Sequence, residues 1–268
     1  MSYLSPLLTM MINAVKKATS SLDRDFSEIE RLQSSVRPYQ NFVTNSYERI
    51  AQNLRVELNK IRPEATLFEN DVASIPTSGN CFLVNPIDGL KNFSRGIAVF
   101  ATTVAYCENG EVKASIIYNR ANDELYFAEK GNGSYKEGFR NHERLRVSAN
   151  KDENFALVAA QIGYDKSDKA FASYGKNMLK LADQSRILGS VGISMAYVAS
   201  GKFDIAFSCG NNLNSTAAGL LLVKEAGGYI YNLDASEIAP AKIEQIIVSH
   251  NVAAANNNME TLIKKWLD

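Results

Sequence analysis

The stretch FLVNPIDGL, residues 82–90, predicts a buried strand that runs into a tight turn opening a helix. Its proline fixes the backbone φ angle at the strand exit, and Gly89 permits a sharp approach to the helix. Asp88 then lies at the positive end of that helix, where the backbone N–H groups of Gly89 and Leu90 can hold a phosphate. A hard cation at Asp88 suits phosphoryl chemistry. Asn85 is close enough to share such a cation but brings no charge.

Composition describes an ordinary soluble globular protein. The chain has 268 residues, of which 46% are hydrophobic and 22% are charged, enough for one large domain or two closely packed halves. Lys+Arg and Asp+Glu both total 29. This balance gives no support to a nucleic acid or a membrane surface as a partner.

The cysteines and the N-terminal segment indicate a cytoplasmic protein. Cys81, Cys107 and Cys209 are widely spaced and form no CxxC pair, which fits a reducing cytoplasm better than a disulfide scaffold. The N-terminus lacks the basic start of a signal peptide and reads instead as an amphipathic helix. The sequence contains no apolar run of 18 residues, so we expect no transmembrane helix.

Hydrophobic periodicity predicts strands and helices in both halves of the chain. The expected helices are 3–33, 48–61 (stopped by Arg62-Pro63), 174–182, 189–200, 216–226 and 258–267. The expected strands are 81–84, 100–106, 112–118, 124–128, 156–160, 203–207, 229–231 and 245–249. Because no clean βαβ repeat appears, this order favours layered α/β (α+β) sheets over a barrel or a Rossmann fold. The polar stretch at 140–155 suggests two halves, 1–145 and 146–268, within one compact unit.

Several other motifs favour structural roles. Gly131-Asn132-Gly133 lies between two expected strands and is typical of a hairpin turn rather than a phosphate loop. His142 and His250 have no nucleophile motif nearby, and we expect both to be structural. A Pro-x-Asp-Gly turn is also more often structural than catalytic when it stands alone.

Four blocks in order strengthen the functional interpretation of Asp88. They are NFVTN at 41–45, FLVNPIDGLKNF at 82–93, GSVGISMAYVASGKFD at 189–204, and STAAGLLLVKEAGG at 215–228. Together they resemble the inositol monophosphatase family, and especially its bacterial extragenic-suppressor branch, over nearly the whole chain. The resemblance implies alternating α-β-α-β-α layers, magnesium as cofactor, and hydrolysis of inositol-1-phosphate or a similar phosphate monoester by metal-activated water.

The resemblance also implies a set of site residues. Metal ligands would be Glu69, Asp88, the Ile87 carbonyl and Asn85, with Glu69 and Asp88 as the catalytic residues and Glu69 helping to orient water. Phosphate and substrate would be held around the turn and at the start of a later helix, by Ile87, Asp88, Gly89, Leu90, Gly189, Ser190 and Val191.

Five positions depart from the family's pattern at this pocket. The metal-binding aspartates of the DPIDGT and WDxAAG motifs correspond to Asn85 and Ser215, and the threonine of the first motif to Leu90. Ser208 stands where the family often has a substrate-gripping glutamate, and Tyr47 stands at the aspartate of the VTxxD segment. An unaligned acid, such as Asp71, remains an alternative replacement for a lost ligand.

These departures predict a degenerate metal centre. A pair of metals at roughly 4 Å would lack its ligands, which leaves one weak Mg²⁺ at Glu69 and Asp88, or none. Losing one positioned polar group costs on the order of 10²–10³ in rate. We therefore expect a feeble phosphatase or a protein that only binds a small phosphorylated polyol. The alternative that the extragenic-suppressor resemblance implies is a non-catalytic adaptor for a transcription-complex protein or ribosomal RNA maturation. The family also implies a homodimer.

Overall fold

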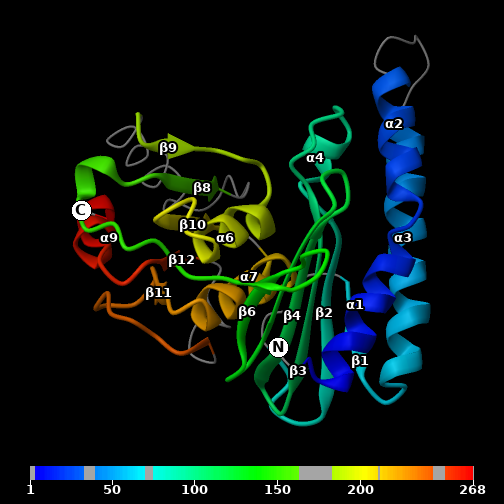
Figure 1. Ribbon diagram of the computed structural model, residues 1–268, viewed down its shortest axis with the longest axis horizontal. Helices are drawn as coiled ribbons and strands as arrows, with labels where there is room; N and C mark the ends of the chain where they lie inside the picture. The colour runs from blue at the N-terminus through cyan, green and yellow to red at the C-terminus, as the bar shows by residue number, and fades with distance from the viewer. Residues whose placement is uncertain are drawn as a thin grey trace.

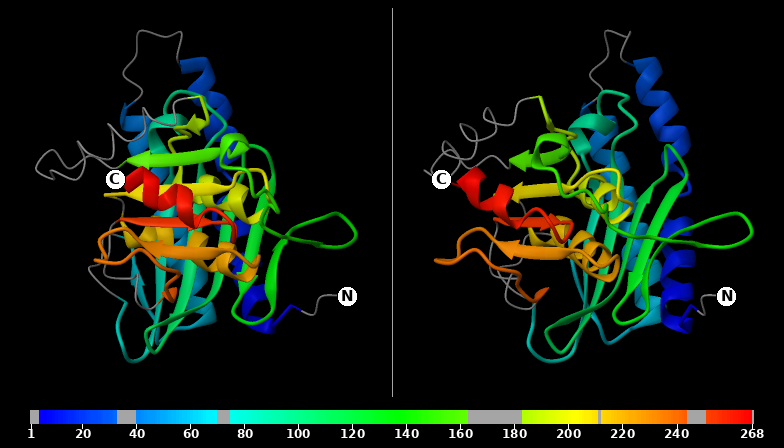
Figure 2. Two further views of the ribbon diagram at one scale, coloured as in Figure 1. Left: turned by 90° about the vertical axis from the view of Figure 1, so that its left-hand side faces the viewer. Right: turned by 60° about the vertical axis from the view of Figure 1, so that its left-hand side comes forward.

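The computed structural model describes residues 4–32, 40–69, 75–162, 183–210, 212–243 and 251–267. It consists of five layers (Figure 1): three helices, a seven-stranded sheet, two helices, a five-stranded sheet and a last helix. This order confirms the expected α-β-α-β-α architecture. Figure 2 shows the same stacking from two further sides.

The first sheet is antiparallel except at one edge. Its strands follow chain order: β1 (Thr66–Phe68), β2 (Asn80–Asp88), β3 (Ala101–Glu108), β4 (Glu111–Asn119), β5 (Glu124–Glu129), β6 (Gly133–Lys136) and β7 (Glu143–Arg144). Only β1 pairs in parallel, with β2. Gly131-Asn132-Gly133 forms the turn of the β5–β6 hairpin, in which Glu129 pairs with Gly133, so the hairpin prediction is confirmed.

Both faces of this sheet are buried, and strand β2 shows how. Phe82 and Val84 pack toward the outer helices, whereas Cys81 and Leu83 pack toward the helices in the middle of the molecule. Successive side chains of a strand point to opposite faces. Asn85 therefore follows Cys81 and Leu83 onto the inner face, which is why a polar side chain in an apolar strand reaches the middle layer.

The outer helix layer corrects one expectation. In place of a single helix over 3–33, the structure has α1 (Pro6–Ala18) and α2 (Leu22–Leu32), followed by α3 (Gln40–Ile61). The Thr19 hydroxyl donates to the Val15 carbonyl at 2.8 Å and ends α1, because a threonine that bonds its own helix backbone competes with helix continuation. The third helix also begins eight residues before the expected Glu48 and ends as predicted before Arg62-Pro63.

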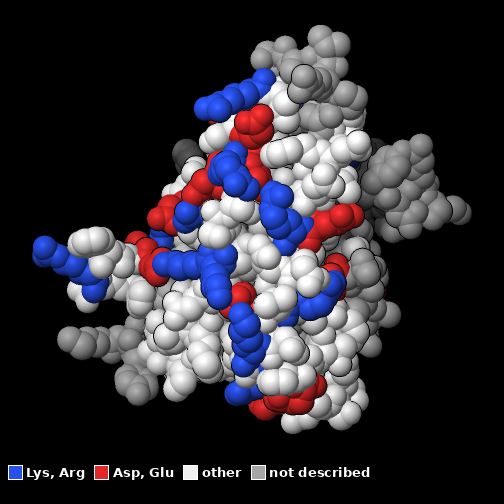
Figure 3. All heavy atoms as spheres, turned by 90° about the vertical axis from the view of Figure 1, so that its right-hand side faces the viewer, with Lys and Arg blue, Asp and Glu red and all other residues white. Residues whose placement is uncertain are grey.

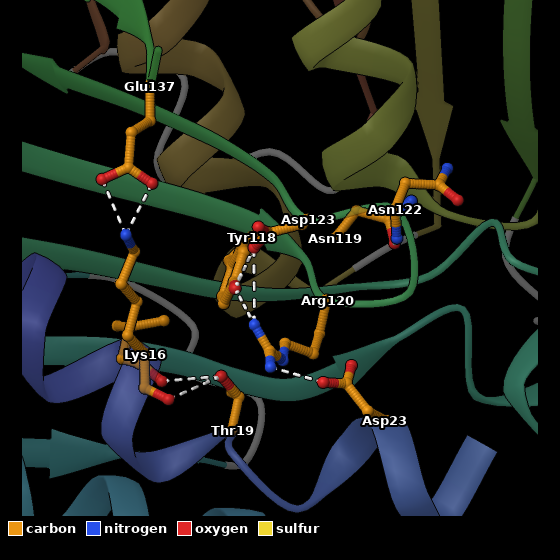
Figure 4. Close-up of polar contacts among 10 residues, drawn as sticks. Lys16, Thr19, Asp23, Tyr118, Asn119, Arg120, Asn122, Asp123 and Glu137 are labelled. Carbon is orange, nitrogen blue, oxygen red and sulfur yellow. Dashed lines mark hydrogen bonds and ion pairs between the residues drawn. The ribbon is translucent and has the colours of Figure 1, made fainter. Parts of the chain in front are cut away.

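Polar contacts fasten these helices to the sheet (Figure 4). Lys16 of α1 forms an ion pair with Glu137 at 2.6 Å, and Asp23 of α2 pairs with Arg120 at the β4–β5 turn. The Arg120 guanidinium also donates to the Tyr118 hydroxyl at 2.6 Å. The outward face of the layer carries interspersed basic and acidic side chains (Figure 3), which matches the balanced total charge.

The second half contributes the inner helices and the second sheet. The strands are β8 (Val158–Ile162), β9 (Ser185–Arg186), β10 (Ile205–Cys209), β11 (Tyr229–Asn232) and β12 (Val252–Ala255), in the order β11-β12-β10-β8-β9. Helices α6 (Val191–Ala199) and α7 (Leu213–Glu225) lie between the sheets, and α9 (Glu260–Leu267) covers the outer face, where Trp266 stacks on Phe207. Two short helices complete the described elements, α4 (Leu90–Phe93) and η1 (Glu153–Phe155).

The remaining expectations divide into three groups. The other expected helices and strands that lie in the described residues are confirmed to within a few residues, but β2 runs through Asp88 rather than ending at Val84. Strands β1, β7 and β9, which have only three, two and two residues, were not predicted. Strand β12 was not predicted either, because its sequence VAAA has no alternation. The helix expected at 174–182 and the strand expected at 245–249 lie outside the described residues. Within the described parts of the chain, no helix is both long and apolar enough to span a bilayer.

Candidate functional site

The predicted site lies where the end of β2 meets the first turns of α6 and α7 (Figure 1). The pairing of β2 with β3 is irregular between Asn85 and Asp88, and the Thr102 hydroxyl accommodates this bulge by donating to the Pro86 carbonyl at 2.7 Å. Bulges re-aim side chains next to functional sites. Alternation already directs Asn85 toward the middle helices, and the bulge brings Asp88, three residues later, to the same side.

Asn85 is bound directly to Ser215. The Asn85 side-chain amide donates to the Ser215 hydroxyl at 2.8 Å, across 130 positions of sequence. These are the two positions at which the family resemblance expects aspartates. The structure brings them together, as that resemblance requires, but as a neutral amide–hydroxyl pair.

Asp88 points to the beginning of α6. Its Oδ2 atom accepts hydrogen bonds from the Ser190 hydroxyl at 2.6 Å and from the Gly192 backbone N–H at 2.7 Å. Ser190 is also the N-cap of α6 and accepts from the Ile193 N–H at 3.2 Å. The carboxylate thus lies at the positive end of a nine-residue helix.

Burial decides the protonation of Asp88. The side chain is only 6% exposed, and desolvation raises its pKa to about 6, although the hydrogen bonds from Ser190, Gly192 and Val191 act in the opposite direction. Asp88 therefore gains and loses its proton at a higher pH, closer to neutral, than an ordinary aspartate does.

Two glycines allow the segments to approach this closely. A Cβ atom on Gly192 would lie 2.8 Å from Thr103 Cγ2 and 3.2 Å from Asp88 Oδ2. Gly89 has φ of 86°, and a Cβ there would lie 3.1 Å from the Gly189 carbonyl oxygen and 3.2 Å from Ser190 Cβ. The structure therefore brings the 89–90 turn against the 189–191 segment, as the substrate-site prediction requires.

The helix after the turn differs from expectation. It is α4, a single turn of four residues, so it supplies little of the helix dipole that we expected at Asp88. That role belongs to α6, which is 102 residues further along the chain. Leu90 is 37% exposed at the start of α4.

Glu69 is held by an arginine that the sequence analysis did not identify. Its Oε2 atom lies 2.6 Å from Arg55 Nη2 of helix α3, while its Oε1 atom is buried and has no hydrogen-bond partner among the residues that the structure describes. Burial, together with the negative charge of Glu69, raises the pKa of the Tyr47 hydroxyl. Tyr47 and Glu69 are therefore neighbours, although Tyr47 offers no carboxylate.

Asn214 joins strands β1, β2 and β3 to α7. Its side-chain amide donates to the backbone carbonyls of Phe68, at 2.7 Å, and Val84, at 3.1 Å, while its backbone carbonyl accepts from the Thr103 hydroxyl at 3.0 Å. Phe68 directly precedes Glu69, so this hydrogen bond ties the backbone next to Glu69 to the residue before Ser215. In the sequence, the polar character of residue 214 was the only sign of this link between α7 and the first sheet.

The other singled-out residues are less informative. Ser208 is buried in β10, beside Gln161 of β8 and Val252 of β12. His142 packs edge-on against Phe127 at 5.0 Å between ring centroids, which favours the structural role that we expected. His250 and Asp71 lie outside the described residues.

The donor set does not fit the paired-magnesium centre that the resemblance implies. Asn85 and Ser215 bind each other, and Oδ2 of Asp88 is already engaged by Ser190 and Gly192. Arg55 neutralises Glu69, which leaves its Oε1 as an open carboxylate oxygen. In the described part of the chain, no three His, Cys, Asp or Glu side chains are grouped as metal ligands would be.

The buried carboxyl of Asp88 predicts an unusual pH dependence of stability. Between its ordinary pKa of 3.8 and about 6, the folded protein binds more protons than the unfolded chain, so the free energy of unfolding falls as pH rises through this window. The loss amounts to about 3 kcal/mol. Asp88→Asn keeps an acceptor oxygen but cannot ionise, so its stability relative to the wild type should be greater at pH 8 than at pH 4.

Urea denaturation at pH 4 to 8 in EDTA-containing buffer measures this difference. The exposed Asp183→Asn variant serves as a control and should follow the wild-type curve. Parallel pH profiles for the wild type and Asp88→Asn would show that the buried carboxyl is not the cause.

Comparisons with known proteins show the family to which the chain belongs. A sequence model of the inositol monophosphatase family matches residues 3–267. The chain is 34% identical over 241 residues to the inositol-1-monophosphatase of Mesorhizobium japonicum, covering 87% of this chain and 88% of that protein. It is 27% identical over 227 residues to the Nus factor SuhB of Xylella fastidiosa, covering 84% and 81%.

A solved structure shares the fold. The extragenic suppressor protein SuhB from Bartonella henselae matches with a TM-score of 0.80 and 27% sequence identity, covering 98% of this chain and 99% of that one. The layers and the match over almost every residue lead to one assignment. The chain belongs to the inositol monophosphatase family.

Proposed function

We propose that this protein binds a small phosphorylated polyol, or a similar phosphate ester, at the β2–α6–α7 site and hydrolyses it feebly or not at all. The observation that carries the proposal is the 2.8 Å hydrogen bond between Asn85 and Ser215. Two aspartates at these positions would repel each other unless a cation lay between them. The amide and hydroxyl satisfy each other without one.

The phosphate end of the ligand is proposed to lie between the Gly89-Leu90 turn and the start of α6. Support comes from the contact between these segments, in which a Cβ on Gly89 would reach Gly189 and Ser190. The first turn of a helix favours an anion. Gly189 to Val191 would line the ring pocket, and any Mg²⁺ would depend on Glu69 and Asp88, with the Ile87 carbonyl, at a single weak site.

Restoring the missing groups should restore turnover. With inositol-1-phosphate and millimolar Mg²⁺, the wild type should release phosphate at a rate close to that of Asp88→Asn. The triple variant Asn85→Asp, Leu90→Thr, Ser215→Asp should exceed both by at least about 100-fold, because one positioned polar group is worth 10²–10³. Calorimetric titration with Mg²⁺ should find tight binding only in the triple variant.

Two results would contradict this proposal. One is robust wild-type turnover that Asp88→Asn abolishes. The other is tight wild-type binding of two Mg²⁺ ions, because Asn85 and Ser215 would then have to act as ligands despite their mutual hydrogen bond.

A second candidate is a non-catalytic adaptor in transcription. It is favoured by relatives such as the Nus factor SuhB of Xylella fastidiosa, which is 27% identical to this chain. If the adaptor function holds, the purified protein should co-elute with the RNA polymerase of its own host when Nus factors are present, in buffer containing EDTA. Failure to co-elute at micromolar concentrations would leave ligand binding as the better proposal.

A homodimer is also proposed, as the family resemblance suggests. Three exposed apolar side chains, those of Leu90, Ile97 and Ile187, support it. They belong to neighbouring segments, because the side chain of Asn92, in α4 with Leu90, donates to the carbonyls of both Val99 and Leu188 at 2.7 Å. Large exposed apolar groups gathered in this way are typical of interaction surfaces.

Light scattering after gel filtration tests this dimer. The wild type should elute with twice the chain mass, and Ile187→Asp should shift it to a monomer. Phe139→Asp removes a still more exposed apolar side chain elsewhere and should leave the dimer intact. A monomeric wild type, or a dimer insensitive to Ile187→Asp, would argue against this surface.

We also propose a cytoplasmic location, which the three buried free thiols support.

A further inference from the structure

Two cysteines face each other across strands β2 and β3, which lie side by side in the first sheet (Figure 1). The antiparallel pairing places Cys81 directly opposite Cys107. Both side chains are buried, and both belong to the apolar cluster between the two sheets. The Cα atoms of residues opposite each other in such a pair lie about 4.5–5.5 Å apart. This separation falls within the roughly 4.4–6.8 Å that a disulfide bond spans.

The two thiols also contact each other. A hydrogen bond between them lowers the pKa of Cys81 and, together with burial, raises the pKa of Cys107. Cys81 is therefore the thiol that ionises more readily, and Cys107 is the one that keeps its proton. The thiolate is the form of cysteine that reacts with oxidants.

A metal site does not account for this pair. Structural zinc takes four ligands, mostly from cysteine and histidine. Among the described residues, no three His, Cys, Asp or Glu side chains are grouped in this way. The third thiol, Cys209, belongs to β10 of the second sheet and packs in a different apolar cluster. Cys81 and Cys107 thus form a pair of thiols, and Cys209 provides an internal reference.

The pair lies near the end of both strands. Cys81 is the second residue of β2, and Cys107 is the last but one of β3. The adjoining β3–β4 turn contains the exposed Asn109, and the pairing of β3 with β4 is irregular between Tyr106 and Cys107. Strand ends open more readily than the middle of a sheet. A small oxidant can therefore reach the thiols without unfolding of the whole protein.

We propose that Cys81 and Cys107 form a reversible disulfide bond when the protein meets hydrogen peroxide or an organic hydroperoxide. The Cys81 thiolate attacks a peroxide oxygen and breaks the O–O bond, which gives a sulfenic acid at Cys81 and, after protonation of the leaving oxygen, water or an alcohol. The Cys107 sulfur then attacks the Cys81 sulfur and displaces hydroxide, which leaves as water with the proton of the Cys107 thiol. Two thiols are oxidised and one peroxide is reduced.

The bond would close a ring that contains part of the candidate site. Residues 81–107 include the FLVNPIDGL stretch, helix α4 and Asp88. A covalent ring of this kind stabilises the fold mainly by restricting the unfolded chain. The proposal does not depend on phosphate binding or hydrolysis, because the thiols lie at the opposite end of β2 from Asp88.

Counting free thiols by mass spectrometry tests the bond. The reduced full-length protein is treated with hydrogen peroxide and then alkylated with a maleimide in denaturant, after which the wild type should carry one label instead of three. Digestion without reductant should yield a peptide in which Cys81 and Cys107 are linked, and dithiothreitol should restore all three labels. The melting temperature of the oxidised protein should exceed that of the reduced protein by roughly 5 °C.

Two matched variants provide the comparison. Cys209→Ala removes the thiol outside the pair and should form the bond as the wild type does. Cys81→Ala should form no disulfide, and peroxide should not raise its melting temperature. The linked peptide from the wild type decides the question even where Cys81→Ala lowers stability.

Three results would overturn the proposal. One is a wild type that keeps all three thiols at peroxide concentrations that oxidise free glutathione. Another is a linked peptide that contains Cys209. The third is an oxidised wild type that melts below the reduced protein, because the bond would then have formed in an unfolded chain rather than between the paired strands.

Discussion

The buried carboxylate of Asp88 is the constraint on which the centre of this molecule depends. It belongs to a strand of the first sheet, yet its hydrogen-bond donors, Ser190 and Gly192, begin a helix in the other half of the chain. A buried charge without such donors would cost several kcal/mol. The β2 bulge, the serine cap of α6 and the missing side chain at Gly192 all serve this one group. Asp88 therefore connects β2 to the start of α6 on one side of the candidate site.

A second link, at Asn214, fixes the other wall. Its side-chain amide binds the end of β1 and the middle of β2, and its backbone carbonyl is tied to β3 through Thr103. The first turn of α7 is therefore locked to three strands, and this brings Ser215 to Asn85. Hydrogen bonds between neutral groups thus connect the first turn of α7 to the first sheet.

Much of this could be predicted from the sequence, and the exceptions have physical reasons. The FLVNPIDGL stretch indicated Asn85 and Asp88 because a motif records local geometry, and strand alternation then directs Asn85 inward. The Arg55–Glu69 pair could not be foreseen, because it depends on how α3 packs against the end of β1. Likewise, the break at Thr19 is accompanied by a side-chain hydrogen bond that periodicity does not record. Strand β12 was missed because alanines carry no strand pattern.

The Asn85–Ser215 pair also bears on how such a protein can change over generations. Exchanging only one partner for aspartate would put a lone negative charge against a hydroxyl or an amide, with no ion strongly held to offset it. Exchanging the second would then add a like charge beside the first. Each intermediate is less favourable than the present pair, so a mutational path back to a metal centre has no easy first step. The 2.8 Å hydrogen bond between Asn85 and Ser215 thus makes a return to two aspartates by single substitutions unfavourable.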